Sequence, residues 1–179
     1  MEPHRHIPGK KLSIIIALIA SVLYGCSAQL SLQKRTDRLI LKTQKVVDTV
    51  FLYSVAFNDF NIVWYHKDNS IHSYKIKPHS TEHYKPINIE ESIILNEDIN
   101  KYFEGFLYKD IKCFEPTLDG EWIIVYIKDK EPLHSSINTG CLFETRFNPN
   151  SFPYWLQYDL YKLRRCPMGY SFEVMYSDE

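Results

Sequence analysis

The 179-residue sequence has few glycines and lacks the short motifs that carry much enzyme chemistry. Its six glycines are spread along the chain, and it has no P-loop, G-x-G-x-x-G, G-x-S-x-G, H-E-x-x-H or C-x-x-C motif. A loop that cradles phosphates needs clustered glycines, which argues against nucleotide chemistry. We therefore predict that the protein is not an enzyme and has no catalytic residues and no cofactor.

The sequence also lacks an excess of positive charge. It has 21 Lys and Arg against 22 Asp and Glu, and without residues 1–25 the balance is 18 to 21. Duplex binding relies on clustered Lys and Arg that replace counterions, and no such cluster is visible. Nucleic acid is therefore not expected as a partner.

A long hydrophobic run is absent, but a short one lies near the N-terminus. Leu12 to Leu23 is uncharged and follows Arg5, Lys10 and Lys11. A membrane span needs about 20 apolar residues, whereas a basic segment followed by a shorter apolar one is the layout of a secretory signal. The alternative is an uncleaved anchor that extends through polar residues to Leu32.

The end of this run resembles the lipobox of bacterial lipoproteins. Leu23 stands three residues before Cys26, Gly25 stands directly before it, and Tyr24 is larger than the residue usual in that place. The resemblance implies that the signal is removed before Cys26, whose sulfur and new amino group are acylated. The lipid bilayer is thus an expected partner. Ser27, in place of the aspartate that retains lipoproteins at the inner membrane, favours the outer membrane.

These features divide the chain into a signal peptide at 1–25, a lipidated tether at 26–35 and one β-rich periplasmic domain at 36–179.

Tyr and Phe are abundant, which favours strands, and an Asp68-Asn69 turn between two apolar segments predicts a hairpin. One short helix is expected at Asp98–Tyr108. The fold class is therefore mainly β, an antiparallel sandwich-like domain. The expected strands are 36–44, 46–57, 61–67, 70–77, 121–128, 141–147, 152–160 and 169–177.

Two groups of polar residues are candidates for a metal site or an enzyme site. His79 and His83 have a spacing seen in zinc sites, but Pro78 and Pro86 bracket them and oppose the helix that would align both rings. A polar loop is the preferred interpretation, so no metal site is predicted. The idea of a hydrolase or metal enzyme rests on the histidines His66, His72, His79 and His83 and on the carboxylates Glu90, Glu91, Glu97 and Asp98.

Three cysteines remain for disulfide bonding if Cys26 is acylated, because disulfides persist in an oxidising compartment. A bridge between Cys113 and Cys141 would close a loop of about 28 residues and contribute roughly 3 to 4 kcal/mol. It would leave Cys166 unpaired. A bridge between Cys141 and Cys166 is the alternative that the sequence leaves open.

Residues 111–160 resemble small enterobacterial periplasmic lipoproteins of the type VI secretion immunity class. The matching segments are Lys112-Cys113-Phe114, Thr139-Gly140-Cys141-Leu142 and Arg146-Phe147-Asn148-Pro149, followed by an aromatic segment that ends at Tyr158-Asp159. The resemblance implies a Cys113–Cys141 bridge and a non-enzymatic binding protein that protects against a secreted toxin. The alternative is an accessory lipoprotein of a secretion or pilus assembly. Either role requires a protein partner whose identity the sequence does not give.

Overall fold

A computed structural model describes residues 9–56, 59–89, 112–114, 120–148 and 151–163 of the chain. The α-helices are α1 (Gly9–Thr43), α2 (Thr139–Glu144) and α3 (Phe152–Leu163), and η2 (Lys112–Phe114) is a 3₁₀ turn. The strands are β1 (Thr49–Val55), β2 (Asn61–Lys67), β3 (Ser70–Ile76), β4 (Thr81–His83), β5 (Ile87–Asn88), β6 (Glu121–Ile127) and β7 (Leu133–Ser136).

The described strands form one antiparallel sheet, which confirms the prediction of an antiparallel β-rich domain. Its order is β4-β3-β2-β1-β6-β7, and β5 also pairs with β3. Strand β1 is central: Phe51 lies opposite Trp64 of β2 on one side and opposite Val125 of β6 on the other. The apolar EWIIVYI run therefore forms an inner strand beside β1, as its composition predicts.

The predicted hairpin is also confirmed. Asp68 and Asn69 have φ values of 50° and 55°, so both occupy the left-handed region that a two-residue turn between antiparallel strands requires. The full-length register of β2 and β3, from Asn61 opposite Ile76 to Lys67 opposite Ser70, follows from this turn.

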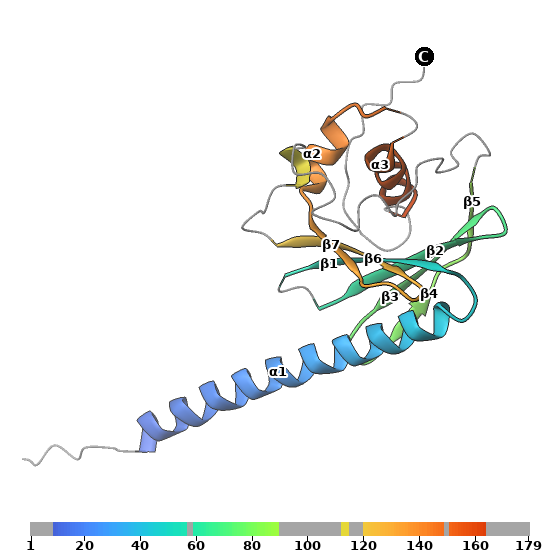
Figure 1. Cartoon of the computed structure of the whole chain (residues 1–179). Coiled ribbons are helices and arrows are strands. Elements are labelled where there is room, and N and C mark those ends of the chain that lie inside the picture. Colours follow the sequence, from blue (N-terminus) through green and yellow to red (C-terminus); the bar gives the residue numbers. More distant parts are fainter. Residues whose placement is uncertain (1–8, 57–58, 90–111, 115–119, 149–150, 164–179) are drawn as a thin grey trace, which may run out of the picture.

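In the part of the chain that the structure describes, helices and not a second sheet cover the two faces of the sheet (Figure 1). Helix α1 packs on one face, where Leu32 and Ile40 join Val50, Leu52 and Val63 in one apolar cluster. Helices α2 and α3 cover the other face, where the larger cluster collects the alternate strand residues. Because successive strand side chains point to opposite faces, Leu52 and Phe51 belong to different clusters. Among the described residues the layers are therefore helix, sheet and helix, in place of the two packed sheets of the predicted sandwich.

Three segments predicted as strands are helical. Residues 36–44 lie mostly in α1, residues 141–147 begin in α2, and residues 152–160 lie in α3. Their apolar residues recur at helical spacing: Leu32, Thr36 and Ile40 are buried along α1, and Phe152, Leu156 and Leu160 are buried along α3. Asn138 also caps α2, because its side chain accepts a hydrogen bond from the Cys141 N–H. The helix predicted at Asp98–Tyr108 and the strand predicted at Gly169–Ser177 lie outside the described residues.

Candidate functional site

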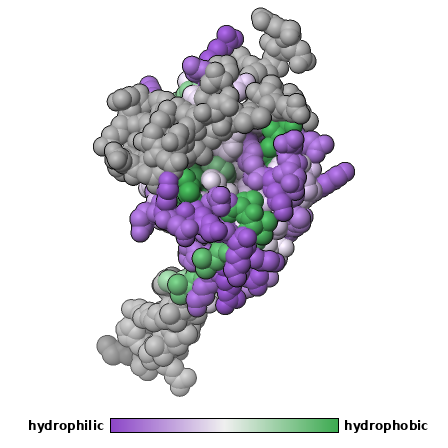
Figure 2. All heavy atoms as spheres, turned by 45° about the vertical axis from the view of Figure 1, so that its right-hand side comes forward, coloured by the Kyte–Doolittle hydropathy of each residue, from purple (hydrophilic) through white to green (hydrophobic). Residues whose placement is uncertain are grey.

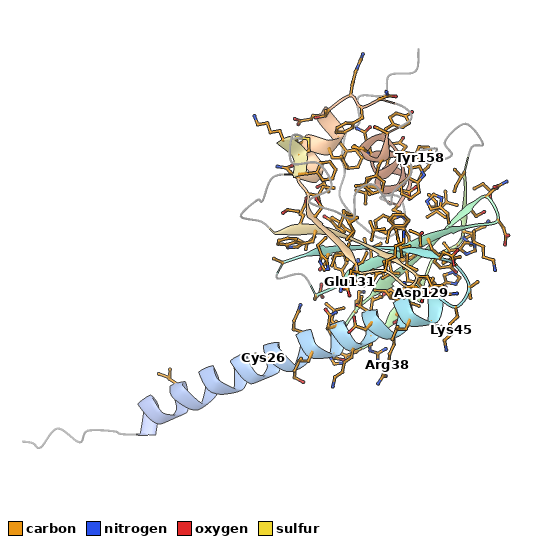
Figure 3. The ribbon with its side chains drawn as sticks, in the orientation of Figure 1. Cys26, Arg38, Lys45, Asp129, Glu131 and Tyr158 are labelled. Atoms are coloured by element: carbon orange, nitrogen blue, oxygen red, sulfur yellow. A yellow bond between two sulfur atoms is a disulfide. The ribbon has the colours of Figure 1, made fainter. Side chains whose placement is uncertain are left out.

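Cys26 lies exposed on α1 with a free thiol. Figure 3 shows it on the part of α1 that projects away from the sheet. Leu32, six residues further on, is only 1% exposed and belongs to the core. Six residues of helix span about 9 Å, so the proposed acylation site lies close to the folded domain.

Side chains that follow Cys26 fix α1 to the domain. The hydroxyl of Ser31 and the Nε of Arg35 both donate to the carbonyl of Pro78, at 2.7 and 2.9 Å. Deeper in the helix, the side-chain amide of Asn61 donates to the buried hydroxyl of Thr36 at 3.1 Å. Residues 31–35, expected to form part of a tether, are therefore helical and in contact with the domain.

Throughout the part of the chain that the structure describes, no helix combines the length and the apolar character needed to cross a bilayer.

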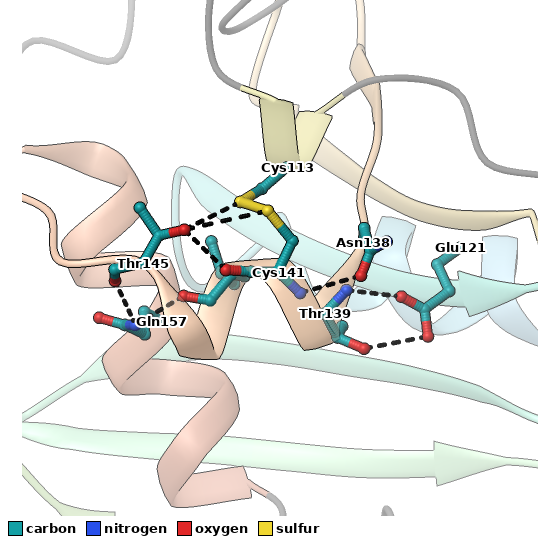
Figure 4. Close-up of a disulfide and its surroundings, with 8 residues drawn as sticks. Cys113, Glu121, Asn138, Thr139, Cys141, Thr145 and Gln157 are labelled. Carbon is teal, nitrogen blue, oxygen red and sulfur yellow. Dashed lines mark hydrogen bonds between the residues drawn. A yellow bond between two sulfur atoms is a disulfide. The ribbon is translucent and has the colours of Figure 1, made fainter. Parts of the chain in front are cut away.

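A disulfide joins Cys113 and Cys141 (Figure 4). This is the bridge that the resemblance of residues 111–160 implies. Its two cysteines lie in η2 and α2, and the backbone N–H of Asn138 also donates to the carbonyl of Cys113 at 2.7 Å. The bridge therefore connects the turn before β6 to the short helix after β7. Cys166, the alternative partner of Cys141, lies outside the described residues.

Buried polar contacts fix both ends of α2 near the disulfide. The Glu121 carboxylate accepts hydrogen bonds from the backbone N–H and hydroxyl of Thr139, at 2.9 and 3.1 Å, and from the Tyr53 hydroxyl at 3.0 Å. At the other end, the Gln157 amide donates to the carbonyls of Leu142 and Thr145, at 2.6 and 3.1 Å. These groups satisfy the open ends of a six-residue helix, so we assign them a structural role.

A second polar group, centred on Asp159, lies on the α3 side of the sheet. The fully buried Asp159 carboxylate accepts hydrogen bonds from the Trp64 indole and from His66 Nε2, both at 2.7 Å and both on Oδ2. A buried carboxylate is costly unless it has such partners. Within the described part of the chain, Oδ1 has no hydrogen-bond partner.

His66 brings this buried group to the surface. Its side chain is 25% exposed, and its ring stacks on Trp155 with ring centroids 4.6 Å apart. Because Nε2 donates to Asp159, the ring is fixed in orientation, and Nδ1 is the nitrogen left for other contacts.

Beside His66 the surface is hollowed, with an open volume of about 250 Å³. We call this site the His66 hollow. On the face shown in Figure 2, hydrophobic residues emerge in small patches between hydrophilic ones. The hollow likewise mixes aromatic rings with polar groups at its edge, as a recognition site requires. It is lined by Val47, Asp48, Thr49, Phe51, His66 and Trp155.

The His66 hollow was not predicted from the sequence, because residues 152–160 were expected to form a strand. Trp155 and Asp159 are four residues apart and so lie on one face of α3, which turns toward Trp64 and His66. An aspartate inside the apolar segment Trp155-Leu156-Gln157-Tyr158-Asp159-Leu160 was the available signal, since such a group needs a buried partner.

The other histidines weighed as ligands take different places. His72 stacks on Tyr65 with ring centroids 5.0 Å apart, and His83 stacks on Tyr74 at 4.5 Å, while Tyr65 and Tyr74 face each other. Burial, reinforced by a hydrogen bond with Tyr74, raises the pKa of Tyr65 to about 12. His79 lies exposed between β3 and β4. Within the described ranges, no three His, Cys, Asp or Glu side chains gather in a way that could hold a metal.

The carboxylates Glu90, Glu91, Glu97 and Asp98 lie outside the described residues. Comparison with known proteins adds no assignment: no family model matches the chain, and neither the curated proteins nor the solved structures contain a match.

Proposed function

We propose that this chain is a lipoprotein held at the outer membrane through acylated Cys26, with a domain that binds a protein partner on its periplasmic side. The observation that carries the proposal is the position of Cys26. It lies exposed on α1, at the end of a lipobox-like sequence and only six residues before the helix enters the core. Acyl chains at this position could enter a bilayer without disturbing the fold.

The disulfide supports a periplasmic location for the domain. Disulfides persist in the periplasm and are rare in the cytosol, and the Cys113–Cys141 bridge joins two segments of the folded domain. The lipobox-like sequence and the bridge are independent features that favour the same side of the membrane.

The His66 hollow is the best-supported place for partner recognition. Rings from β1, β2 and α3 line it, and the buried Asp159 fixes the imidazole of His66, the partly exposed ring among them. Rigid aromatic side chains beside polar groups are typical of the energetic centre of an interface. Recognition fits better than catalysis, because Asp159 is fully buried and uses one oxygen for two donors.

The nature of the partner separates two versions of the proposal. An immunity protein, favoured by the resemblance of residues 111–160, would bind a single soluble toxin. An accessory lipoprotein would bind subunits of an envelope assembly.

Site-specific crosslinking in cells tests the binding role. A photo-crosslinking amino acid would replace the exposed Asp48 at the edge of the hollow, with a control at the exposed Glu144 on α2. We expect a defined crosslinked product from position 48 and not from position 144, and mass spectrometry would show whether it contains a toxin or an assembly subunit. Equal products, or none, at the two positions would contradict recognition at the hollow.

Membrane fractionation tests the tether separately. We expect the mature protein in the outer-membrane fraction, with an N-terminal peptide whose mass shows acylated Cys26. A soluble protein that begins at Met1 would contradict it.

A further inference from the structure

Helix α1 presents a basic face away from the sheet, in addition to the apolar face that it packs on the core. The segment from Cys26 to Lys45 contains five of the 18 basic residues that follow residue 25, but only one of the 21 acidic ones, Asp37. The domain as a whole carries slightly more acidic than basic residues, so basic charge is concentrated on this one element, contrary to the expectation from the sequence that Lys and Arg form no cluster.

The helical spacing places these charges together. Leu30, Lys34 and Leu41 recur at intervals of four and seven residues, which align on one face of α1, and Arg38 and Lys42 lie beside them. Lys45 lies in the turn directly after the helix. All six side chains are exposed. Figure 3 shows Arg38 and Lys45 on the side of α1 turned away from the sheet. We call this set the outer face of α1: Leu30, Lys34, Arg38, Leu41, Lys42 and Lys45.

Two exposed leucines stand among the charges. Leu30 is 62% exposed and Leu41 is 64% exposed, while the leucine on the opposite side, Leu32, is almost completely buried. Asp37, the acidic residue of this segment, accepts a hydrogen bond from the Gln33 amide at 2.8 Å, and its charge also acts on Tyr126 of β6. Basic side chains interleaved with exposed leucines are the pattern of a helix that lies at a membrane surface.

We infer that the outer face of α1 rests on an anionic phospholipid surface, so that the chain is held by its acyl groups and by charge together. The orientation rests on the proposed tether: acyl chains on Cys26 bring this end of α1 to the membrane, and the rest of the helix to Thr43 extends for about 26 Å. Lipid anchors commonly need a second contribution from a basic patch. Each basic side chain near an anionic surface contributes about a fivefold gain in association.

This orientation has a consequence for recognition. Helix α1 packs on one face of the sheet, whereas His66 and Trp155 lie on the side covered by α3. With α1 on the membrane, the sheet lies between the lipid surface and α3, and the His66 hollow is held on the domain's side away from the outer face of α1.

Lysine footprinting on vesicles tests the inference. Full-length protein extracted from membranes is added to vesicles of neutral phosphatidylcholine or of phosphatidylcholine with phosphatidylglycerol, and its amines are then acetylated and quantified by mass spectrometry. We expect acetylation of Lys34 and Lys45 to be at least about fivefold slower on the anionic vesicles, with the protection lost at high salt. The exposed Lys67, at the end of β2, and the exposed Lys85, between β4 and β5, serve as internal controls and should react equally on both kinds of vesicle.

Two charge-matched variants complete the test. In Lys34→Glu/Lys45→Glu we expect the remaining Lys42 to lose its protection, whereas Lys67→Glu/Lys85→Glu should retain it. Equal acetylation of Lys34 and Lys45 on both kinds of vesicle would overturn the inference, whether the two lysines react quickly on both or slowly on both. The intact mass of the same protein shows whether Cys26 is acylated, so failure of the tether and failure of the basic face are distinguishable.

Discussion

Removal of the Cys113–Cys141 bridge should destabilise the domain by an amount that follows from its loop. The two cysteines are 28 residues apart, and closing a loop of that length removes chain entropy from the unfolded state worth about 3.5 kcal/mol at room temperature. A domain of this size has a total stability of roughly 5 to 15 kcal/mol. The bridge is therefore expected to supply a large share of it.

The perturbation is the pair Cys113→Ala/Cys141→Ala, compared with wild-type protein in denaturant unfolding with and without a reducing agent. We expect the variant and the reduced wild type to lose similar free energy of unfolding, which corresponds in thermal unfolding to a fall in Tm of roughly 10 °C. The substitutions leave the hydrogen bond from the Asn138 backbone to the residue 113 carbonyl available, so α2 keeps one connection to η2.

Cys166→Ser is the matched control and should cost much less. Non-reducing peptide mapping of the wild type should recover one fragment that contains Cys113 and Cys141. A loss below about 1 kcal/mol in the paired variant would refute the loop-entropy argument, and recovery of a Cys141–Cys166 fragment would refute the pairing itself.

Three further changes test other parts of the structure. Asp159→Ala should lower the free energy of unfolding in urea by about 3 kcal/mol, because it leaves the buried Trp64 indole N–H without an acceptor. Asp159→Asn keeps an acceptor and should cost less. Equal losses in the two variants would contradict this account. Gly120→Ala should cost at least about 1 kcal/mol, because Gly120 has φ +57° and a Cβ there would lie 2.7 Å from the Ala56 Cβ, whereas Gly140→Ala, without positive φ, should be milder. The folded-state pKa of Tyr65 is raised from 10.0 to about 12, so its contribution is complete below pH 10 and lost as the pH rises toward 12. Ultraviolet titration of Tyr65→Phe should lack this late phenol ionisation, and an unchanged titration curve would contradict the assignment.

The strands of the sheet were predicted from the sequence better than the helices that pack on it. Strand β6 and the β2–β3 hairpin have signals that only one structure satisfies: a short apolar run suited to an inner strand, and an Asp-Asn turn with positive φ. Around Cys141 and from Phe152 to Leu160, the spacing of the apolar residues fits a helix as well as a strand. The short α2 also depends on contacts with Glu121 and Gln157, which are distant in sequence. Periodicity alone does not distinguish such segments.

The candidate site was predicted only where it is local. Cys26 follows from adjacent residues, and the Cys113–Cys141 pairing was one of two open alternatives. The His66 hollow depends on Asp159 reaching across 93 residues of sequence to His66, and no short motif encodes that contact. The same holds for the outer face of α1, which can be recognised only when residues 26–43 are known to form one helix and its buried side is known.

Acylation of Cys26 is the central claim, and metabolic labelling measures it most directly. Cells that produce the wild type or Cys26→Ala are grown with an alkyne fatty acid, and the purified protein is coupled to a dye after removal of free lipid. We expect label on the wild type, which should run as a processed chain, and no label on Cys26→Ala, which should remain an unprocessed precursor. Equal labelling of the two proteins, or none on either while a known lipoprotein in the same cells is labelled, would contradict the account.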